Sequence, residues 1–216
     1  MTPPPPPPPE SDHYFSADPA TPFEREAFSC QVWGERLDLV SGSGVYSRGR
    51  LDPGTAVLFR ETDPPTPGRL LDIGTGYGVI GLAIAASWRS RPLPDDSVVT
   101  GVDVNRRAVL LANENAASLA LVDRFRACAP DEVPGDARFD EIWSNPPIRI
   151  GKTALHALLL HWFGRLEPEG RAVMVVGRNL GADSLQAWLT DKGYPTTRLG
   201  SAKGFRVLEA RPGEKG

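Results

Sequence analysis

Three short segments of the sequence contain residue types whose spacing suits ligand binding and group transfer. The first is DIGTGYG, residues 72–78, in which three glycines alternate with other residues. Glycine adopts positive φ readily and lets the backbone approach a ligand closely. If a helix follows, its first N–H groups can bind a carboxylate or a phosphate. A dinucleotide fingerprint requires Gly or Ala at position 79, where this chain has Val79, so the spacing disfavours a nicotinamide cofactor.

The second segment is centred on Asp103, at the end of the apolar, β-branched run 98–104. In nucleotide-binding α/β folds, an acidic side chain at the end of the second strand accepts hydrogen bonds from ribose hydroxyls. The alternative is that Asp103 caps the helix expected from Arg106, a position that suits Asn105 better. We therefore expect ribose binding at Asp103 if the glycine segment binds a cofactor.

The third segment is Asn145-Pro146-Pro147, which follows the strand pattern of residues 139–144. Proline cannot continue a central strand, so two prolines predict a stiff loop whose carbonyls point outward. The Asn145 side-chain oxygen and one such carbonyl form a pair of acceptors that suits a planar NH₂ group. Such an amine is a poor nucleophile, and fixing it under an electrophile favours attack. The alternative is a turn that merely ends the strand.

These segments require a fold that brings three loops to one place. The chain from residue 69 alternates strand and helix patterns, which predicts a parallel sheet covered by helices on both faces. The first of these strands is then central, and ligands gather at the carboxyl ends of the strands. The predicted strands are 70–73, 98–104, 125–128, 139–144, 172–176 and 205–210. The predicted helices are 79–88, 106–121, 153–166 and 184–192, the last capped by Asp183 or Ser184, and Trp143 is expected in the core.

Before residue 69 the sequence has a different character. Residues 1–12 include seven consecutive prolines and predict a disordered tail. Residues 13–68 predict an N-terminal extension with a hairpin within 27–45, turning at Trp33-Gly34, and a short helix over 55–61. The remaining span, 69–211, is the expected catalytic domain. The length suits one large domain better than two.

Charge and composition narrow the classes of partner. The formal net charge of −3 excludes binding of nucleic acid by bulk charge alone. From Ile148 onward, 11 basic residues oppose six acidic ones, so this part is +5 and the rest is −8. Cys30 and Cys128 show no CxxC spacing, which indicates neither a zinc site nor a disulfide framework. No apolar run is long enough to span a membrane and no secretory signal is visible, so the expected compartment is the cytoplasm.

Read with their neighbours, the three segments resemble class I S-adenosylmethionine-dependent methyltransferases. The resemblance is carried by LLDIGTGYGVIGLAIA, GVDVNRRAVLLANENA and FDEIWSNPPIRIGK, and it covers about residues 13–210. More narrowly, GVYSRGRLDPGT and KGFRVLEA are similar to the methyltransferase small domain family, which includes ribosomal RNA guanine methyltransferases acting on the 2-amino group. This resemblance implies an α/β Rossmann-like fold whose seven-stranded, mostly parallel sheet has helices on both faces. It also implies S-adenosyl-L-methionine as the cofactor and RNA, above all ribosomal RNA, as the partner.

The resemblance also assigns roles to residues. Asp72, Gly74 and Gly76 would hold the methionine part of the cofactor, and Asp103 its ribose. Asn145 and Pro146, with Pro147, would hold the target amine. Further expected cofactor contacts are Thr75, Gly78, Val104, Asp131 and Asn145. Expected substrate contacts are Tyr46, Ile148, Arg149, Lys152, Lys203 and Arg206. The segment expected to cover the cofactor contains Leu51, Asp52, Gly54 and Thr55.

Two positions depart from the family pattern. Ala129, with Asp131 close by, stands where members carry a polar residue near the adenine. Ile148 stands where an aromatic residue often follows the prolines, so base stacking falls to Tyr46, Phe15 or Arg149.

Alternative functions remain open at this stage. One is a methyltransferase for a glutamine amide, an adenine or a small-molecule amine. The other is a non-catalytic domain that binds RNA or a protein partner. His156 and His161 are five residues apart on a predicted helix and are expected as ordinary helix positions, not metal ligands.

Overall fold

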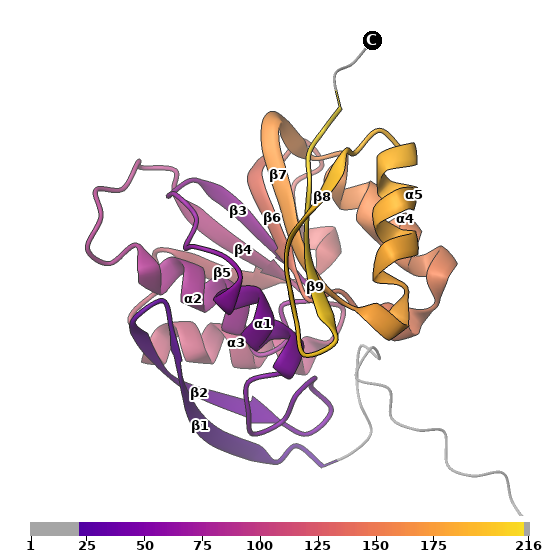
Figure 1. Ribbon diagram of the computed structural model, residues 1–216. Helices are drawn as coiled ribbons and strands as arrows, with labels where there is room; N and C mark the ends of the chain where they lie inside the picture. Colours follow the sequence, from indigo (N-terminus) through magenta and orange to yellow (C-terminus); the bar gives the residue numbers. More distant parts are fainter. Residues whose placement is uncertain (1–21, 214–216) are drawn as a thin grey trace, which may run out of the picture.

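The structure is a computed structural model that describes residues 22–213, so the predicted tail and Phe15 lie outside the described residues. It is built on a seven-stranded sheet of order β5-β4-β3-β6-β7-β9-β8 (Figure 1). The strands are β3 (Arg69–Ile73), β4 (Val98–Val102), β5 (Phe125–Cys128), β6 (Phe139–Ser144), β7 (Leu166–Gly177), β8 (Thr196–Ala202) and β9 (Phe205–Ala210). The first five in that order are parallel, and β9 runs antiparallel to both its neighbours. The expected seven-stranded, mostly parallel sheet is confirmed.

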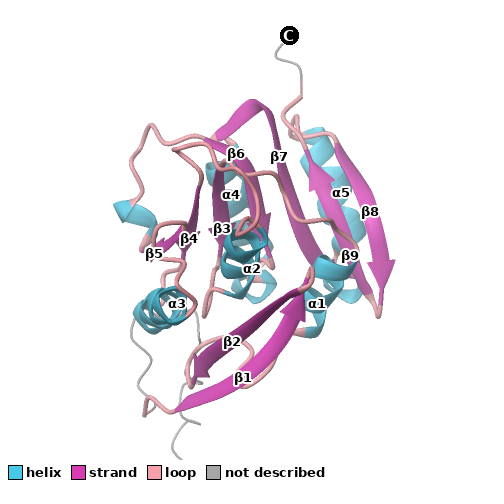
Figure 2. Ribbon diagram, turned by 90° about the vertical axis from the view of Figure 1, so that its left-hand side faces the viewer, coloured by secondary structure: helices cyan, strands magenta, loops and turns pink. Residues whose placement is uncertain are grey.

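Helices cover both faces of the sheet, as expected (Figure 2). One face carries α1 (Pro53–Arg60), α2 (Val79–Ser87) and α3 (Arg106–Ser118), and the other carries α4 (Lys152–Phe163) and α5 (Ala182–Asp191). Each face of the sheet has its own hydrophobic core, and alternate strand residues belong to different cores. Leu70 packs with the first group of helices and Leu71 with the second. Each strand residue points to the opposite face from its neighbour, so a strand buried on both faces is apolar at most of its positions.

The N-terminal hairpin forms a separate two-stranded sheet, β1 (Arg25–Val32) paired with β2 (Glu35–Gly42). Its turn is at Trp33 and Gly34, both with positive φ, where the sequence predicted it. The hairpin docks on α3 through Asn115, whose side chain accepts from the Val40 N–H at 2.8 Å and donates to the Val40 carbonyl at 2.9 Å. These contacts join the N-terminal hairpin to helix α3 of the domain that follows.

Several element boundaries differ from the predicted ones. β4 ends at Val102, which leaves Asp103 and Val104 in a loop. β7 already begins at Leu166, inside the stretch predicted as a helix. Strand β8 was missed because its residues are largely exposed at the sheet edge and show no apolar alternation. The expected cap of α5 by Asp183 or Ser184 is wrong: the helix begins at Ala182, preceded by Gly181 at φ 92° with no side-chain cap.

Other expectations about local structure hold. Asn105 caps α3 by accepting a hydrogen bond from the Arg107 N–H. Trp143 is fully buried in the core. Among residues 22–213, no helix has the length and apolarity needed to cross a membrane.

Candidate active site

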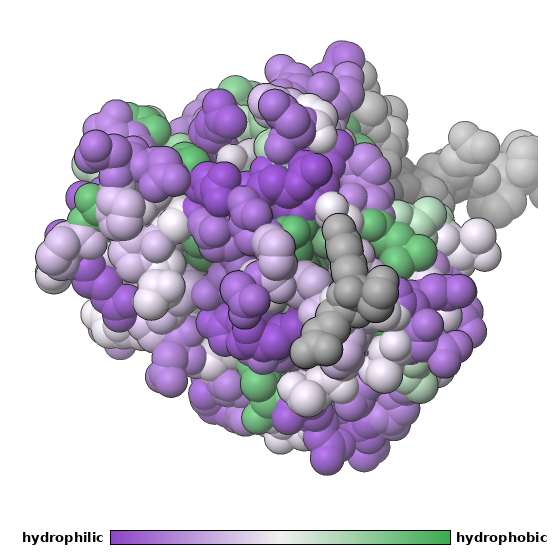
Figure 3. Space-filling model, turned by 90° about the horizontal axis from the view of Figure 1, so that it is seen from above, coloured by the Kyte–Doolittle hydropathy of each residue, from purple (hydrophilic) through white to green (hydrophobic). Residues whose placement is uncertain are grey.

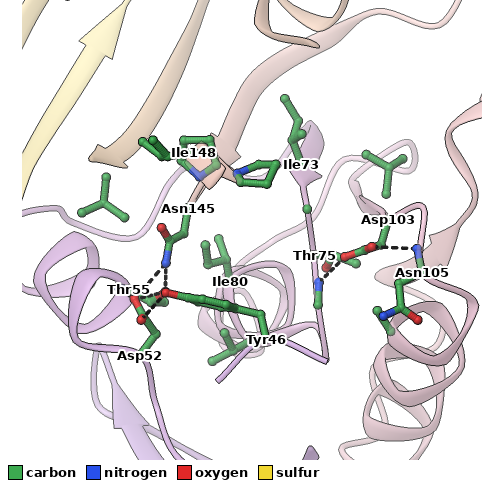
Figure 4. A pocket seen from close by; sticks show the side chains of 18 of the residues that line it. Tyr46, Asp52, Thr55, Ile73, Thr75, Ile80, Asp103, Asn105, Asn145 and Ile148 are labelled. Atoms are coloured by element: carbon green, nitrogen blue, oxygen red, sulfur yellow. Dashed lines mark hydrogen bonds between the residues drawn. The ribbon is translucent and has the colours of Figure 1, made fainter. Parts of the chain in front are cut away.

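The carboxyl ends of β3, β4 and β6 open onto one cavity of about 270 Å³ (Figure 4). In the sheet register, Ile73 pairs with Val102 on one side and with Ser144 on the other. The loops that follow these three residues therefore start at the same level and face the same space. The three segments singled out in the sequence converge there, and each contributes to the cavity wall.

The glycine loop crosses the end of β3 with positive φ at every glycine: 69° at Gly74, 57° at Gly76 and 92° at Gly78. A Cβ added to Gly74 meets nothing nearer than Pro147 at 3.8 Å, and one on Gly76 meets nothing nearer than 4.0 Å. At Gly78 a Cβ lies 3.1 Å from the Ala112 side chain. Gly74 and Gly76 thus leave open room for a ligand, whereas Gly78 is needed for packing between α2 and α3.

Asp72 lies behind the glycine loop and is not part of the cavity wall. Its Oδ2 accepts hydrogen bonds from the Thr75 hydroxyl at 2.7 Å and from the Gly81 N–H at 3.0 Å. Its Oδ1 is buried without a hydrogen-bond partner. Burial raises the pKa of the Asp72 carboxyl to about 7, although both hydrogen bonds oppose that shift. Asp72 therefore stabilises the glycine loop from behind and does not line the cavity.

Asp103 lies in the cavity wall with its carboxylate held by backbone groups. Its Oδ1 accepts from the Asn105 N–H and its Oδ2 from the Gly76 N–H, each at 2.9 Å. Burial raises the pKa of this carboxyl, against those hydrogen bonds. A carboxylate has about four acceptor positions, and backbone groups of Asn105, Gly76 and Val104 bind this one, so Asp103 retains acceptor capacity for a ligand hydroxyl. Val104, beside it, is 51% exposed and also lines the cavity.

Asn145, on the loop after β6, is bound to a segment far away in the sequence. Its Nδ2 donates to the Asp52 Oδ2 at 2.8 Å and to the Thr55 Oγ1 at 3.0 Å. The Tyr46 hydroxyl donates to the other oxygen of Asp52 at 2.6 Å. Figure 4 shows these groups gathered on one side of the cavity. Both amide hydrogens of Asn145 are therefore used within the protein, and its Oδ1 is the part left to accept from a ligand.

The expected substrate and cofactor residues divide into two groups by position. The cavity wall contains Tyr46, Gly74, Thr75, Gly76, Asp103, Val104, Asn145, Pro146, Pro147, Ile148 and Arg149. Outside it lie Asp72, Gly78, Asp131, Lys152, Lys203 and Arg206. Lys152 and His156 line a smaller second cavity of about 210 Å³ instead. Arg206 forms an ion pair with Asp183, and Lys203 stands in the turn between β8 and β9.

The apolar half of the cavity was not predicted from the sequence. Among its residues are Ile80 of α2, Trp162 of α4, Val175 of β7 and Phe205 of β9. Their types match those of ordinary core residues, so no sequence signal separates them from the core. Near Asp103, Pro130 lines the cavity, while Asp131 is exposed.

The two histidines of α4 contact aromatic side chains of the described part of the chain. His156 stacks on Trp188 with ring centroids 3.5 Å apart, and His161 meets the edge of Trp162. Within residues 22–213, no group of three His, Cys, Asp or Glu side chains is arranged to hold a metal ion.

Comparison of the sequence with known proteins finds a matching family and similar chains. A family model described as "Methyltransferase small domain" matches residues 36–209. The chain is 30% identical to "Uncharacterized protein YbxB" of Bacillus subtilis over 204 residues, which cover 93% of this chain and 98% of that protein. It is 38% identical to "Ribosomal RNA small subunit methyltransferase C" of Klebsiella pneumoniae over 141 residues, 62% of this chain and 38% of that one. The chain thus spans nearly all of YbxB but about two fifths of this ribosomal RNA methyltransferase.

Comparison with solved structures also finds a methyltransferase of similar fold. The 16S rRNA N2 methyltransferase RsmC of T. thermophilus, solved in complex with AdoMet and guanosine, aligns with a TM-score of 0.75 and 26% sequence identity. The alignment covers 90% of this chain and 52% of that one.

Proposed function

The chain belongs to the methyltransferase small domain family, and we propose that it transfers a methyl group from S-adenosyl-L-methionine to the exocyclic 2-amino group of a guanine in ribosomal RNA. Family membership confirms the resemblance noted in the sequence. The observation that supports the acceptor best is Asn145, whose amide is fixed at the cavity with both hydrogens bound inside the protein. The substrate class implies action in the cytoplasm.

The cavity suits the cofactor at the loops after β3 and β4. Gly74 and Gly76 leave space where side chains would stand, which fits the methionine part. Asp103 offers acceptor positions for the ribose hydroxyls, and the exposed side chain of Val104 offers apolar surface beside it. When bound, S-adenosyl-L-methionine supplies a methyl group on a positively charged sulfur that is already activated toward nucleophiles. The protein therefore has to bind and orient its ligands and needs no additional nucleophile.

The acceptor side is formed by the loop after β6. Asn145 Oδ1 and the Pro146 carbonyl would each accept one hydrogen of the target amine. The Pro146 carbonyl already accepts from the Ile148 N–H at 2.8 Å, and its second lone pair remains for a ligand. Two acceptors on a planar NH₂ group fix both its position and the direction of its lone pair, which is the arrangement that transfer requires.

The target base would enter between apolar and aromatic side chains. Tyr46 is 43% exposed and lines the cavity, and its ring would stack on a base. Ile148, in place of the more usual aromatic residue, lines the same cavity. Arg149 is exposed there and would contact a phosphate. A guanine in a helix must leave its stack to reach Asn145, so the proposal favours an unpaired or flipped base.

One observation favours a second candidate, an amine on a protein or a small molecule. Within residues 22–213, Arg149 is the single basic side chain that lines the cavity, and the whole chain is acidic. RNA-modifying proteins usually present several cations around the substrate entrance. The two candidates share the cofactor and the Asn145 loop and differ only in what carries the amine.

The test is to incubate the protein with methyl-labelled S-adenosyl-L-methionine and, separately, with ribosomal RNA, intact small ribosomal subunits and a protein extract. We expect label in RNA, recovered as N2-methylguanosine by nucleoside mass spectrometry, and none with Asn145→Ala. Label confined to protein or to small molecules would replace the RNA proposal with the second candidate.

A further inference from the structure

The carboxylate of Asp52 joins three groups that lie apart in the sequence. Its Oδ2 accepts from the Thr55 N–H at 2.9 Å, which caps α1, and from the Asn145 amide at 2.8 Å. Its Oδ1 accepts from the Tyr46 hydroxyl at 2.6 Å. Asp52 is only 8% exposed, so these contacts take the place of water around the carboxylate.

These contacts select one of the two orientations of the Asn145 amide. Rotating that amide by half a turn exchanges its oxygen and its NH₂ group at almost the same shape. The exchanged form would put the amide oxygen against the Asp52 oxygen, which can only accept. It would also leave the hydrogens of Asn145 pointing at the acceptor amine, which needs an oxygen there. The observed form satisfies both requirements.

We propose that Asp52 is a positioning residue for methyl transfer: it holds the Asn145 side chain with its oxygen turned toward the acceptor amine, and it fixes the Tyr46 ring through the same carboxylate. Thr55 assists, because its hydroxyl accepts the second Asn145 hydrogen at 3.0 Å. The inference rests on the proposed amine acceptor and deepens it. It also gives the N-terminal segment a part in the reaction beyond covering the cofactor.

Asp52 is also the N-cap of α1, so the test must separate capping from orientation. Serine and asparagine both cap helices about as well as aspartate. In Asp52→Asn, one side-chain oxygen still accepts from both the Thr55 N–H and the Asn145 amide. In Asp52→Ser, the shorter side chain caps the helix but does not reach Asn145. The two variants are matched in capping and differ in their reach to the Asn145 amide.

For the full chain we expect Asp52→Ser to lower kcat by roughly 100-fold, the usual scale for losing an oriented group at a reaction centre. Asp52→Asn should stay within about tenfold of the wild type. Calorimetric Kd for S-adenosyl-L-methionine and the urea unfolding midpoint should match in the two variants. Equal kcat in the two variants would overturn the proposal, because capping alone would then explain Asp52.

A second measurement needs no acceptor. In ¹⁵N spectra, the side-chain NH₂ signal of Asn145, identified by its loss in Asn145→Ala, should exchange slowly with water in the wild type and in Asp52→Asn. It should exchange fast in Asp52→Ser. Fast exchange in the wild type would contradict the proposal even if methyl transfer to RNA is found. If the wild type transfers no methyl to RNA but this signal behaves as expected, the acceptor assignment fails and the role of Asp52 stands.

Discussion

Polar side chains at the two ends of the central sheet differ in their partners: at one end they pair with one another, and at the other they face a cavity. At the amino ends of the parallel strands, Arg69 pairs with Asp96, Asp140 and Glu167, and the Asp140 carboxylate also accepts from the Arg69 N–H. Figure 3 views this end and shows a largely hydrophilic surface in its described part. At the carboxyl ends, Asp103 and Asn145 face a cavity lined largely by apolar residues. Charges that satisfy one another hold a structure together, whereas polar groups with unused acceptor positions are available to a ligand.

This difference follows from the topology of the sheet. Loops at the carboxyl ends of parallel strands are held in register by the strands, yet their side chains project past the last hydrogen bond of the ladder. The amino ends receive chain returning from helices, and the charges there meet one another at the surface. Substitutions at the two ends should therefore affect different properties: transfer and cofactor affinity at one end, and stability alone at the other.

The largest effect is expected at Asn145. Asn145→Ala removes the acceptor for the target amine without touching the glycine loop, so kcat should fall by about 10² to 10³. The Kd for S-adenosyl-L-methionine, measured by calorimetry, should stay near the wild-type value. A parallel loss of cofactor affinity would show that the loop after β6 serves the cofactor and not the acceptor.

Asp103 should show the reverse pattern. Asp103→Ala removes the expected partner of the ribose hydroxyls and the acceptor of the Gly76 N–H. One charged hydrogen bond contributes about 1.5–3 kcal/mol when well formed, so the cofactor Kd should rise about tenfold or more. At saturating cofactor, kcat should recover most of its wild-type value. If kcat stays low at saturating cofactor, Asp103 also contributes to methyl transfer, and the cofactor and acceptor sides of the cavity are not separate.

The buried carboxyl of Asp72 should make the stability of the folded protein depend on pH. The pKa of its carboxyl is about 7 in the folded protein and near 3.8 when exposed, so the folded state holds the proton more tightly. Stability of the ligand-free protein should therefore fall as pH rises from about 4 to about 7, and Asp103, whose pKa is also raised, acts in the same direction.

Asp72→Asn removes the cost of the buried charge and keeps an oxygen for Thr75 and Gly81. It should raise the free energy of unfolding at pH 8 by a few kcal/mol, since each unit of the pKa shift corresponds to about 1.4 kcal/mol, and leave it almost unchanged at pH 4. Urea denaturation at the two pH values measures this. An equal change at both pH values would mean that Asp72 is not the titrating group.

The smallest effect is expected at the opposite end. Arg69→Ala breaks ion pairs that are partly exposed to water, which contribute about 1 kcal/mol or less. Methyl transfer and cofactor Kd should match the wild type, while the urea midpoint should fall slightly and more so at low salt. A loss of transfer in Arg69→Ala at normal stability would remove the distinction between the two ends.

Much of the fold was predictable because its signals are local. Short apolar runs predicted six strands of the sheet, and the glycines after β3 marked an element boundary that the structure shares. The short helix predicted over 55–61 is α1, which begins earlier, at Pro53, and ends at Arg60. Strand β8 was not predicted because an exposed edge strand needs no apolar alternation. The cap of α5 was misplaced because the helix already begins at Ala182, before Asp183, so the position that precedes it is Gly181, which has no side chain.

By itself, the sequence determined which loops carry the polar chemistry: DIGTGYG, Asp103 and Asn145-Pro146-Pro147 each follow a recognisable strand, and parallel strands place their ends together. Only the tertiary structure decided how the amide of Asn145 is oriented. Asp52 lies 93 residues earlier and meets Asn145 because α1 packs beside β7 and β9. A hydrogen bond between such distant residues has no periodicity or turn chemistry to reveal it, since it depends on how completed elements pack against each other.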